Sequence, residues 1–348
     1  GPMLRILLLL VFVGITGCSD RASIVRIEGP TMGTAYHIAW VGQQDDAASL
    51  KAEVDSRLAA INRIMSTYDP ASELSLINQG KAATDADGWI PVSADLAEVL
   101  ADSLTIYTRS DGLFDISVGP LVNLWGFGPD ARYDEVPSAE ALQQAMNETG
   151  LNALQYDADK PAIRLNGKRY LDLSAIAKGW AVDDIAEHLE AHDIHNYMVE
   201  IGGEIRTAGS KPGQAPWRIA IERPGALTEG RSAELVIEPG NAAVATSGDY
   251  RNYFEQDGVR YSHTINPFTG RPVTHRLASV TVINESSAMA DGWATALNVA
   301  GPDKGMALAE QYQLAVFMIV RSEDGFIEKA SPAFRKAFMN SEQPDGQE

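Results

Sequence analysis

Asp291 and Thr295 are the first residues whose types and spacing could do chemistry. They stand four positions apart within residues 286–300, which have the apolar spacing of a helix, so their side chains share one face. A carboxylate and a hydroxyl one turn apart form a sparse oxygen site. Proteins usually hold Mg²⁺ in this way, with substrate phosphates and water completing its octahedron. The alternative is that both side chains bond only to nearby backbone, and a helix considered by itself favours this alternative.

Residues 171–179 could bind a phosphate. An extended stretch ends in Asp172 and continues into a helix through small residues. A helix N-terminus presents free N–H groups and the positive end of a dipole, and Lys178 would add a point charge. The segment lacks the glycine spacing of a Walker motif. Taken alone, it leaves two interpretations open: a phosphate site, or a helix that Asp172 merely caps and on which Lys178 is solvated.

His263 could act as a general base, because it lies where a predicted strand meets an Asn-Pro turn. A histidine at such a junction is more often structural. Two glycine signals, Thr31-Met-Gly-Thr34 and Ile201-Gly-Gly-Glu204, would let the backbone approach a ligand closely. Both patterns also occur in plain turns.

Three further histidines could present imidazoles to zinc from one helix face. His188, His192 and His195 follow one another at intervals of four and three residues. Glu190, however, stands two residues after His188 instead of directly beside it, as the motif of zinc proteases requires. The segment also resembles the end of an amphipathic helix. The sequence therefore favours a solvated helix end over a zinc site.

Both helices and strands are predicted to position these residues. Apolar spacing predicts helices over 46–66, 93–109, 138–148, 176–192, 286–300 and 303–312. Strands are expected at 162–165, 197–201, 217–221, 234–237, 280–283 and 314–320. This order predicts an α+β (mixed α/β) fold, with a mixed sheet core flanked by helices.

Composition excludes some partners. The chain has 348 residues with 47 acidic and 28 basic side chains, a formal net charge of −19. Such a surface argues against nucleic acid and against charge-driven docking on anionic lipid. Hydrophobic residues make up 45% of the chain, which is enough for a buried core. The sequence shows no internal repeat and no linker that would separate domains.

The N-terminus has the pattern of an export signal. Two residues that look like a remnant of cloning precede Met3, and a basic residue then leads into an apolar run over 6–13. Small residues before Cys18 resemble the lipobox of bacterial lipoproteins, although an ordinary secretory signal or a buried strand is the alternative. Cys18 is the chain's only cysteine, which favours lipidation there and leaves the mature chain without a disulfide. We expect residues 1–18 to comprise the cloning remnant and the lipoprotein signal, cut so that Cys18 becomes the first mature residue, with 19–28 as a tether and 341–348 as a flexible tail. Residues 29–340 would form a single domain, which two closely packed lobes could make up.

Together these pieces have a recognisable order. Over residues 29–320 the chain resembles the FAD:protein FMN transferases, the ApbE family. The N-terminal blocks that carry the resemblance are Thr31-Met-Gly-Thr34, Ser66-Thr-Tyr68, Ser72-Glu-Leu-Ser75 with Asn78, Gly112-Leu-Phe-Asp115 and residues 119–127. The later blocks are residues 172–179, Ile201-Gly-Gly-Glu204, Thr246-Ser-Gly-Asp249, residues 263–270 and residues 291–295.

The resemblance implies a Mg²⁺-dependent transfer of FMN from FAD to a Thr or Ser hydroxyl of an acceptor protein, with AMP as the leaving group. By the same resemblance, the FAD pocket would be lined by Met32, Tyr68, Phe114, Asp115, Asp172, Lys178 and Ile265. The metal would lie between Asp291, Thr295 and backbone oxygen near Ala175, with Ala294 as a further candidate ligand. His263 would be the catalytic residue. Ala175 and Asn266 replace residues that are commonly Gly and Asp in the family, so no charge-dependent role is assigned to Asn266.

The acceptor and the cell compartment follow only as family expectations. Subunits of membrane redox complexes would be the acceptors, and the chain would work on the periplasmic side of a bacterial membrane, anchored through Cys18. The inner membrane is expected, with the outer membrane left open. Two other functions use the same features: hydrolysis of FAD to FMN and AMP, or non-catalytic flavin binding by a lipoprotein.

Overall fold

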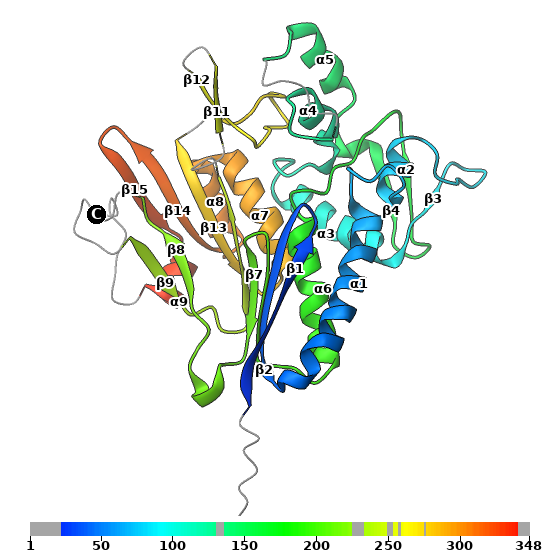
Figure 1. The fold of residues 1–348 in the computed structure, drawn as a ribbon. Helices are drawn as coiled ribbons and strands as arrows, with labels where there is room; N and C mark the ends of the chain where they lie inside the picture. Colours follow the sequence, from blue (N-terminus) through cyan, green and yellow to red (C-terminus); the bar gives the residue numbers. More distant parts are fainter. Residues whose placement is uncertain are drawn as a thin grey trace, which may run out of the picture.

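The computed structural model describes residues 22–129, 136–224, 233–248, 253–256, 259–274 and 276–339. Its centre is an eight-stranded sheet in the order β1-β2-β6-β7-β10-β13-β14-β15 (Figure 1). These strands are β1 (Ser23–Thr31), β2 (Thr34–Gly42), β6 (Tyr197–Ile201), β7 (Glu204–Ala208), β10 (Ala242–Ser247), β13 (Leu277–Asn284), β14 (Ala315–Ser322) and β15 (Gly325–Ala330).

The predicted α+β class is confirmed, with one refinement to the sheet. Every neighbouring pair of these eight strands is antiparallel, where a mixture of directions was expected. Antiparallel strands can be joined by tight turns, and two residues suffice to join β1 to β2, β6 to β7 and β14 to β15.

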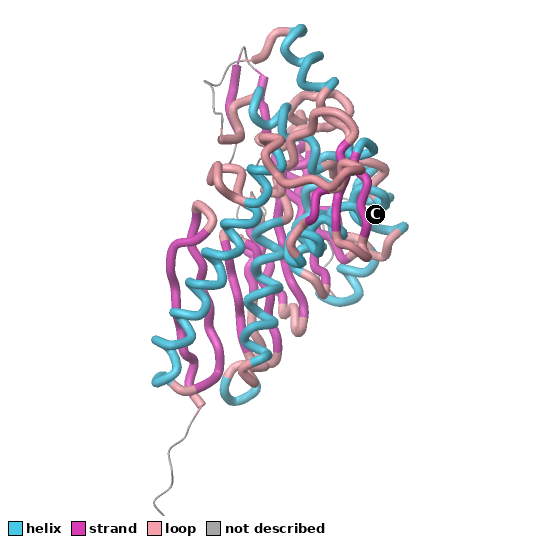
Figure 2. Tube along the Cα trace, turned by 90° about the vertical axis from the view of Figure 1, so that its right-hand side faces the viewer, coloured by secondary structure: helices cyan, strands magenta, loops and turns pink. Residues whose placement is uncertain are grey.

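Helices cover one face of the sheet. α1 (Ala47–Met65), α6 (Ala177–Ala191), α7 (Ser287–Ala300) and α8 (Pro302–Gln311) pack on the strands, and α3 (Ala94–Arg109) packs on α7. Figure 2 views the molecule from the side of α1 and α6. The predicted apolar stripe of α1 is confirmed, because Leu50, Val54, Leu58 and Ile61 are all buried against the sheet and its neighbouring helices.

The opposite face carries a second, smaller core. It is formed by the hairpin of β8 (Ile219–Glu222) and β9 (Glu234–Ile237) together with α9 (Pro332–Phe338). The central strand β13 is therefore covered on both faces, and seven of its eight residues are buried. The strand predicted at residues 280–283 is therefore the second half of a longer strand that begins at Leu277.

Smaller elements complete the described part of the chain. They are the three-stranded sheet β3 (Ile90–Pro91), β5 (Ala162–Leu165) and β4 (Leu154–Asp157), the hairpin of β11 (Tyr253–Gln256) and β12 (Val259–Ser262), and the short helices α2 (Glu73–Asn78), α4 (Gly119–Leu124) and α5 (Ala139–Asn147). Single turns of 3₁₀ helix lie at η1 (Gln44–Asp46), η2 (Ile116–Val118), η3 (Leu151–Ala153) and η4 (Pro212–Gln214).

The expected tether over residues 19–28 is wrong in its second half. Ser23 already begins β1, which pairs with β2 along its whole length. Val25 and Ile27 point into the core while Arg26 and Glu28 are exposed, an alternation that identifies a half-buried strand. Cys18, the rest of residues 1–21 and the expected tail at 341–348 lie outside the described residues. Within the described ranges, no helix is both long enough and apolar enough to span a membrane.

Candidate functional site

Two neighbouring cavities share a wall, and the larger is lined on one side by the β1–β2 turn, which contacts the β6–β7 turn. The turns are joined by the Gly202 N–H, which donates to the Ala35 carbonyl at 3.2 Å. The larger cavity has a volume of about 790 Å³ and the smaller about 150 Å³, and Asp172 and Ser174 line both. Of the predicted site residues, the larger cavity is lined by Met32, Tyr68, Asp172 and Lys178. The smaller is lined by Phe114, Asp115, Asp172, Ala175, His263, Ile265 and Thr295.

The loop after α1 forms one wall of the larger cavity. The carbonyl of Ser66, directly after α1, accepts hydrogen bonds from the hydroxyls of Ser72 (2.5 Å) and Ser75 (3.0 Å). These bonds hold the two ends of the loop together. Tyr68 projects from this loop with 69% of its surface exposed, so its ring is available to a flat ligand. Opposite it, Met32 occupies the β1–β2 turn with a left-handed φ of 49°.

Asp172 is held at the shared wall by its neighbours. The side chain of Asn78 bonds both backbone groups of Leu171, at 2.8 and 2.9 Å, as a pairing strand would. The Asp172 N–H donates to the Ile116 carbonyl, and its Oδ1 accepts the Ser174 N–H at 2.8 Å. Asp172 therefore closes a local turn and faces both cavities. The interpretation that it caps the helix is wrong, because the N-cap of α6 is Ile176, which makes no side-chain cap bond.

Lys178 brings a positive charge to the larger cavity. Its stem crosses Gly202, where a Cβ would come within 3.0 Å of the lysine Cδ. Among the described residues, no hydrogen bond or ion pair involves the Lys178 amine. The amine is thus placed to bind an anionic ligand, because no carboxylate in the described part of the chain contacts it directly.

Asp291 lies where α6 and α7 cross. Its Oδ2 accepts the N–H of Gly179 at 3.0 Å. The helices approach closely because Gly179 has no side chain: a Cβ there would lie 2.4 Å from the Ser287 carbonyl oxygen and 2.7 Å from the Asp291 Cβ. The crossing therefore places the Asp291 carboxylate beneath the first turn of α6, the turn that carries Lys178.

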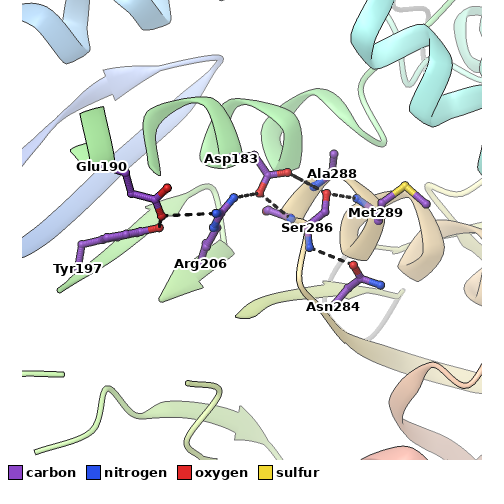
Figure 3. A network of polar contacts seen from close by, with 9 residues as sticks. Asp183, Glu190, Tyr197, Arg206, Asn284, Ser286, Ala288 and Met289 are labelled. Carbon is purple, nitrogen blue, oxygen red and sulfur yellow. Dashed lines mark hydrogen bonds and ion pairs between the residues drawn. The ribbon is translucent and has the colours of Figure 1, made fainter. Parts of the chain in front are cut away.

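A polar network fixes α7 in this position (Figure 3). The Asp183 carboxylate of α6 accepts the N–H groups of Ser287 (2.8 Å) and Ala288 (2.9 Å) and the Ser286 hydroxyl (3.0 Å). It thereby caps the N-terminus of α7 with a negative charge, which the helix dipole favours. Arg206 donates to the same carboxylate at 2.8 Å and extends the network to the adjacent strand β7.

Glu204 is a site residue that the sequence analysis did not assign. It is 8% exposed at the start of β7, and its buried Oε2 has no hydrogen-bond partner among the described residues. Burial raises the pKa of its carboxyl well above the usual range, the charge of Asp291 raises it further, and Lys178 lowers it. Burial likewise raises the pKa of Asp291 to about 7, against the opposing effects of the Gly179 N–H and Lys178.

These buried acids fit a cation. Two carboxyls withdrawn from water beside one ammonium form a place where additional positive charge is favourable. Oxygen donors of this kind suit Mg²⁺, and Thr295 and Ala175 line the smaller cavity together. Ala294 is 1% exposed and lines neither cavity, so its assignment as a ligand stays a prediction.

The smaller cavity holds the remaining predicted residues. Phe114 and Ile265 are buried in its wall. Asp115 is engaged locally: its oxygens accept the Ser117 N–H (2.7 Å), the Ser117 hydroxyl (2.6 Å) and, at 3.3 Å, the Leu151 N–H. It therefore fixes the shape of the wall instead of offering a free charge.

His263 is exposed at the mouth of the smaller cavity. Its ring packs edge-on against Phe127, with ring centroids 4.7 Å apart. The following residue, Thr264, accepts a hydrogen bond at 3.0 Å from Asn298 of α7, which ties the histidine's loop to the helix that carries Asp291 and Thr295. The imidazole thus lines the smaller cavity on a residue that is exposed to solvent.

The fold and the site together are those of a transferase, as comparisons with known proteins show. The chain belongs to the ApbE family, whose family model matches residues 32–318. The FAD:protein FMN transferase of Vibrio cholerae serotype O1 is 47% identical over 323 residues, covering 92% of this chain and 95% of that protein. The FAD:protein FMN transferase of Haemophilus influenzae is 42% identical, covering 93% and 94%.

Solved structures agree with this assignment. The flavin transferase ApbE from Vibrio cholerae superimposes with a TM-score of 0.83 at 46% identity, covering 91% of this chain and 99% of that one. The apo form of the Pseudomonas stutzeri flavinyl transferase ApbE also gives 0.83, at 40% identity, covering 91% and 97%. The resemblance predicted from the sequence is confirmed, as are the ApbE-like fold and the transferase class.

Proposed function

We propose that this chain transfers FMN from FAD to a Thr or Ser hydroxyl of an acceptor protein, in a Mg²⁺-dependent reaction that releases AMP. The observation that carries the proposal is the shared wall of the two cavities. There Asp172 and Ser174 separate a space large enough for a cofactor from a small space that opens on His263. The names of the curated relatives support the donor and the product.

The chain's residues divide the work of attack on a pyrophosphate. Lys178 would bind the pyrophosphate oxygens and stabilise the departing phosphate of AMP. His263 would accept the proton of the acceptor hydroxyl as its oxygen bonds to the phosphorus of FMN and the bond from that phosphorus to the AMP oxygen breaks. Asp291, Thr295 and backbone near Ala175 would hold Mg²⁺, which supplies further neutralisation of phosphate charge when bound.

The location and the partner are part of the same proposal. The lipobox-like N-terminus supports export and a lipid anchor at Cys18, which would place the enzyme on the periplasmic side of a bacterial membrane. Acceptors would then be subunits of membrane redox complexes that present Thr or Ser on that side. Mass spectrometry should find lipid on Cys18 of the wild-type protein and none on Cys18→Ser.

Mass spectrometry of co-expressed acceptor candidates tests the reaction. We expect a covalent FMN adduct with the wild-type enzyme and none with Asp291→Asn. Asp303→Asn is the matched control, because it makes the same change on the neighbouring helix α8, where the side chain is 98% exposed. His263→Ala should bind FAD but not transfer FMN, whereas the exposed His195→Ala should do both.

The same assay separates transfer from hydrolysis. FAD and Mg²⁺ are incubated with enzyme, with and without acceptor, and AMP is measured. AMP release that requires acceptor supports transfer. Equal AMP release without acceptor would identify a pyrophosphatase, and FAD recovered intact in both arms would identify a binding protein.

A further inference from the structure

Two histidines at the end of α6 meet a glutamate of α1 outside the site described above. The Nε2 atoms of His188 and His192 lie 3.2 and 3.1 Å from the same oxygen, Oε2 of Glu53. The two imidazole rings stand with their centroids 4.9 Å apart. Across the described residues, this is the one group of three His, Cys, Asp or Glu side chains whose ligand atoms all lie within 4.8 Å of one another.

The spacing on α6 produces this arrangement. Residues four apart project from one helix face, so His188 and His192 point the same way, toward α1. His195 lies beyond the helix and outside the cluster, and its Nε2 is 4.0 Å from Asp193. The solvated helix end expected from the sequence is therefore only half right: the side chains are partly exposed, but two of the three histidines share a carboxylate from a distant helix.

The distances suit a metal ion. Ligand atoms that bind Zn²⁺ at about 2.0–2.1 Å in a tetrahedron lie roughly 3.3 Å from each other. The two histidine–glutamate separations are already close to this value, so an ion needs only small side-chain rotations. The side chains of His188, His192 and Glu53 are 29%, 45% and 45% exposed, which leaves the fourth position open to water.

We propose that Glu53, His188 and His192 bind a borderline divalent transition-metal ion, with Zn²⁺ as its representative. Two imidazoles and one carboxylate form a donor set for late first-row ions and suit Mg²⁺ poorly. The ion would join α1 to α6 one turn beyond the bidentate pair of Arg57 and Asp184, whose N–O distances are 2.7 and 2.8 Å. It is a structural clamp, separate from the catalytic metal.

Calorimetry with Zn²⁺ tests the proposal on full-length protein without a polyhistidine tag. Excess Mg²⁺ and an Asp291→Asn background exclude binding at the catalytic site. We expect one Zn²⁺ per chain, bound at least about tenfold more weakly by His188→Ala and by His192→Ala. His195→Ala, on the same helix end, should bind like the parent protein.

Two further readouts keep the test decisive. Zn²⁺ at about 100 times its Kd should raise Tm by several degrees in the parent and in His195→Ala but not in His188→Ala. Co²⁺ should give visible absorption bands of a low-coordinate site that Glu53→Gln, an isosteric change, weakens. Unchanged Zn²⁺ affinity in the His188→Ala/His192→Ala variant, or no Zn²⁺ binding by the parent at about 100 μM, would overturn the proposal.

Discussion

Lys178→Met should separate recognition of the pyrophosphate from recognition of the flavin ring. Methionine keeps an unbranched apolar stem over Gly202 and removes only the charge. The Lys178 amine has no hydrogen bond or ion pair with any described residue, so the substitution breaks no direct polar contact. A hydrogen bond between a charged group and its ligand contributes about 1.5–3 kcal/mol. The affinity for FAD should therefore fall about 10- to 150-fold.

Quenching of flavin fluorescence measures this loss with a series of ligands. FAD and FMN carry phosphate and should both bind more weakly to Lys178→Met, whereas riboflavin has none and should bind as it does to the wild type. Lys304→Met, a change of an exposed lysine on α8, is the control and should leave all three affinities unchanged. Riboflavin affinity that fell as far as FAD affinity would refute the reasoning, because the loss would then come from a distorted cavity.

Three other substitutions test the architecture of the site and of the helical layer. Asp291→Asn can still accept the Gly179 N–H but should lose the Mg²⁺-dependent rise in Tm, and a wild-type response in scanning fluorimetry would contradict the metal assignment. Gly179→Ala should destabilise the protein by about 1–3 kcal/mol in urea denaturation through its clash with the Ser287 carbonyl. Without the clash, alanine at a helical glycine would instead stabilise the protein by up to about 1 kcal/mol. The sign of the change in the free energy of unfolding therefore shows whether the clash is present. Burial, and then the charges of Glu98 and Asp183, raise the pKa of Asp102 to about 6. A carboxyl with a raised pKa in the folded state destabilises the protein as pH rises from 3.8 through 6. Asp102→Asn should therefore stabilise by about 1–2 kcal/mol at pH 7.5, after discounting for partial exposure, and show no such gain at pH 4.

Local patterns predicted most of the helices and several strands. Three predicted helices begin at Ser93, Ser138 and Ser286, and each serine caps its helix, because its hydroxyl accepts the N–H three residues on. Strands β5, β6 and β9 begin and end where they were predicted. These features depend on spacing within one segment, which the sequence displays directly.

The contacts that complete the sites could not be predicted in this way. Glu204 was visible only as part of a glycine turn. Its electrostatic interaction with Asp291 depends on how β7 lies against α7, and the two acids stand 87 residues apart in the chain. Glu53 likewise stands on an exposed helix face with no signal of its own. Glu53 and His188 are separated by 135 positions in the sequence, and no local pattern would pair them.

The pairing of α1 with α6 also relates the proposed clamp to the larger cavity. Moving four residues forward on α1, from Glu53 to Arg57, corresponds to moving four residues back on α6, from His188 to Asp184, so the helices are antiparallel. Continued to nine residues beyond Glu53, the same register pairs Asn62 with Gly179, next to Lys178, and so reaches the larger cavity about 14 Å from the clamp. The clamp could alter the cavity only by shifting one helix against the other.

Arg57 opposes such a shift, because it bonds Asp184 through two nitrogen atoms and Asp95 of α3 through one of them. We therefore expect saturating Zn²⁺ to raise Tm while changing the Kd for FAD by less than about twofold, well below typical allosteric coupling. In Arg57→Met the restraint is removed, and the Kd for FAD should become dependent on Zn²⁺. A Zn²⁺-dependent Kd in the wild type would show instead that the two helices slide with the Arg57 pairs intact.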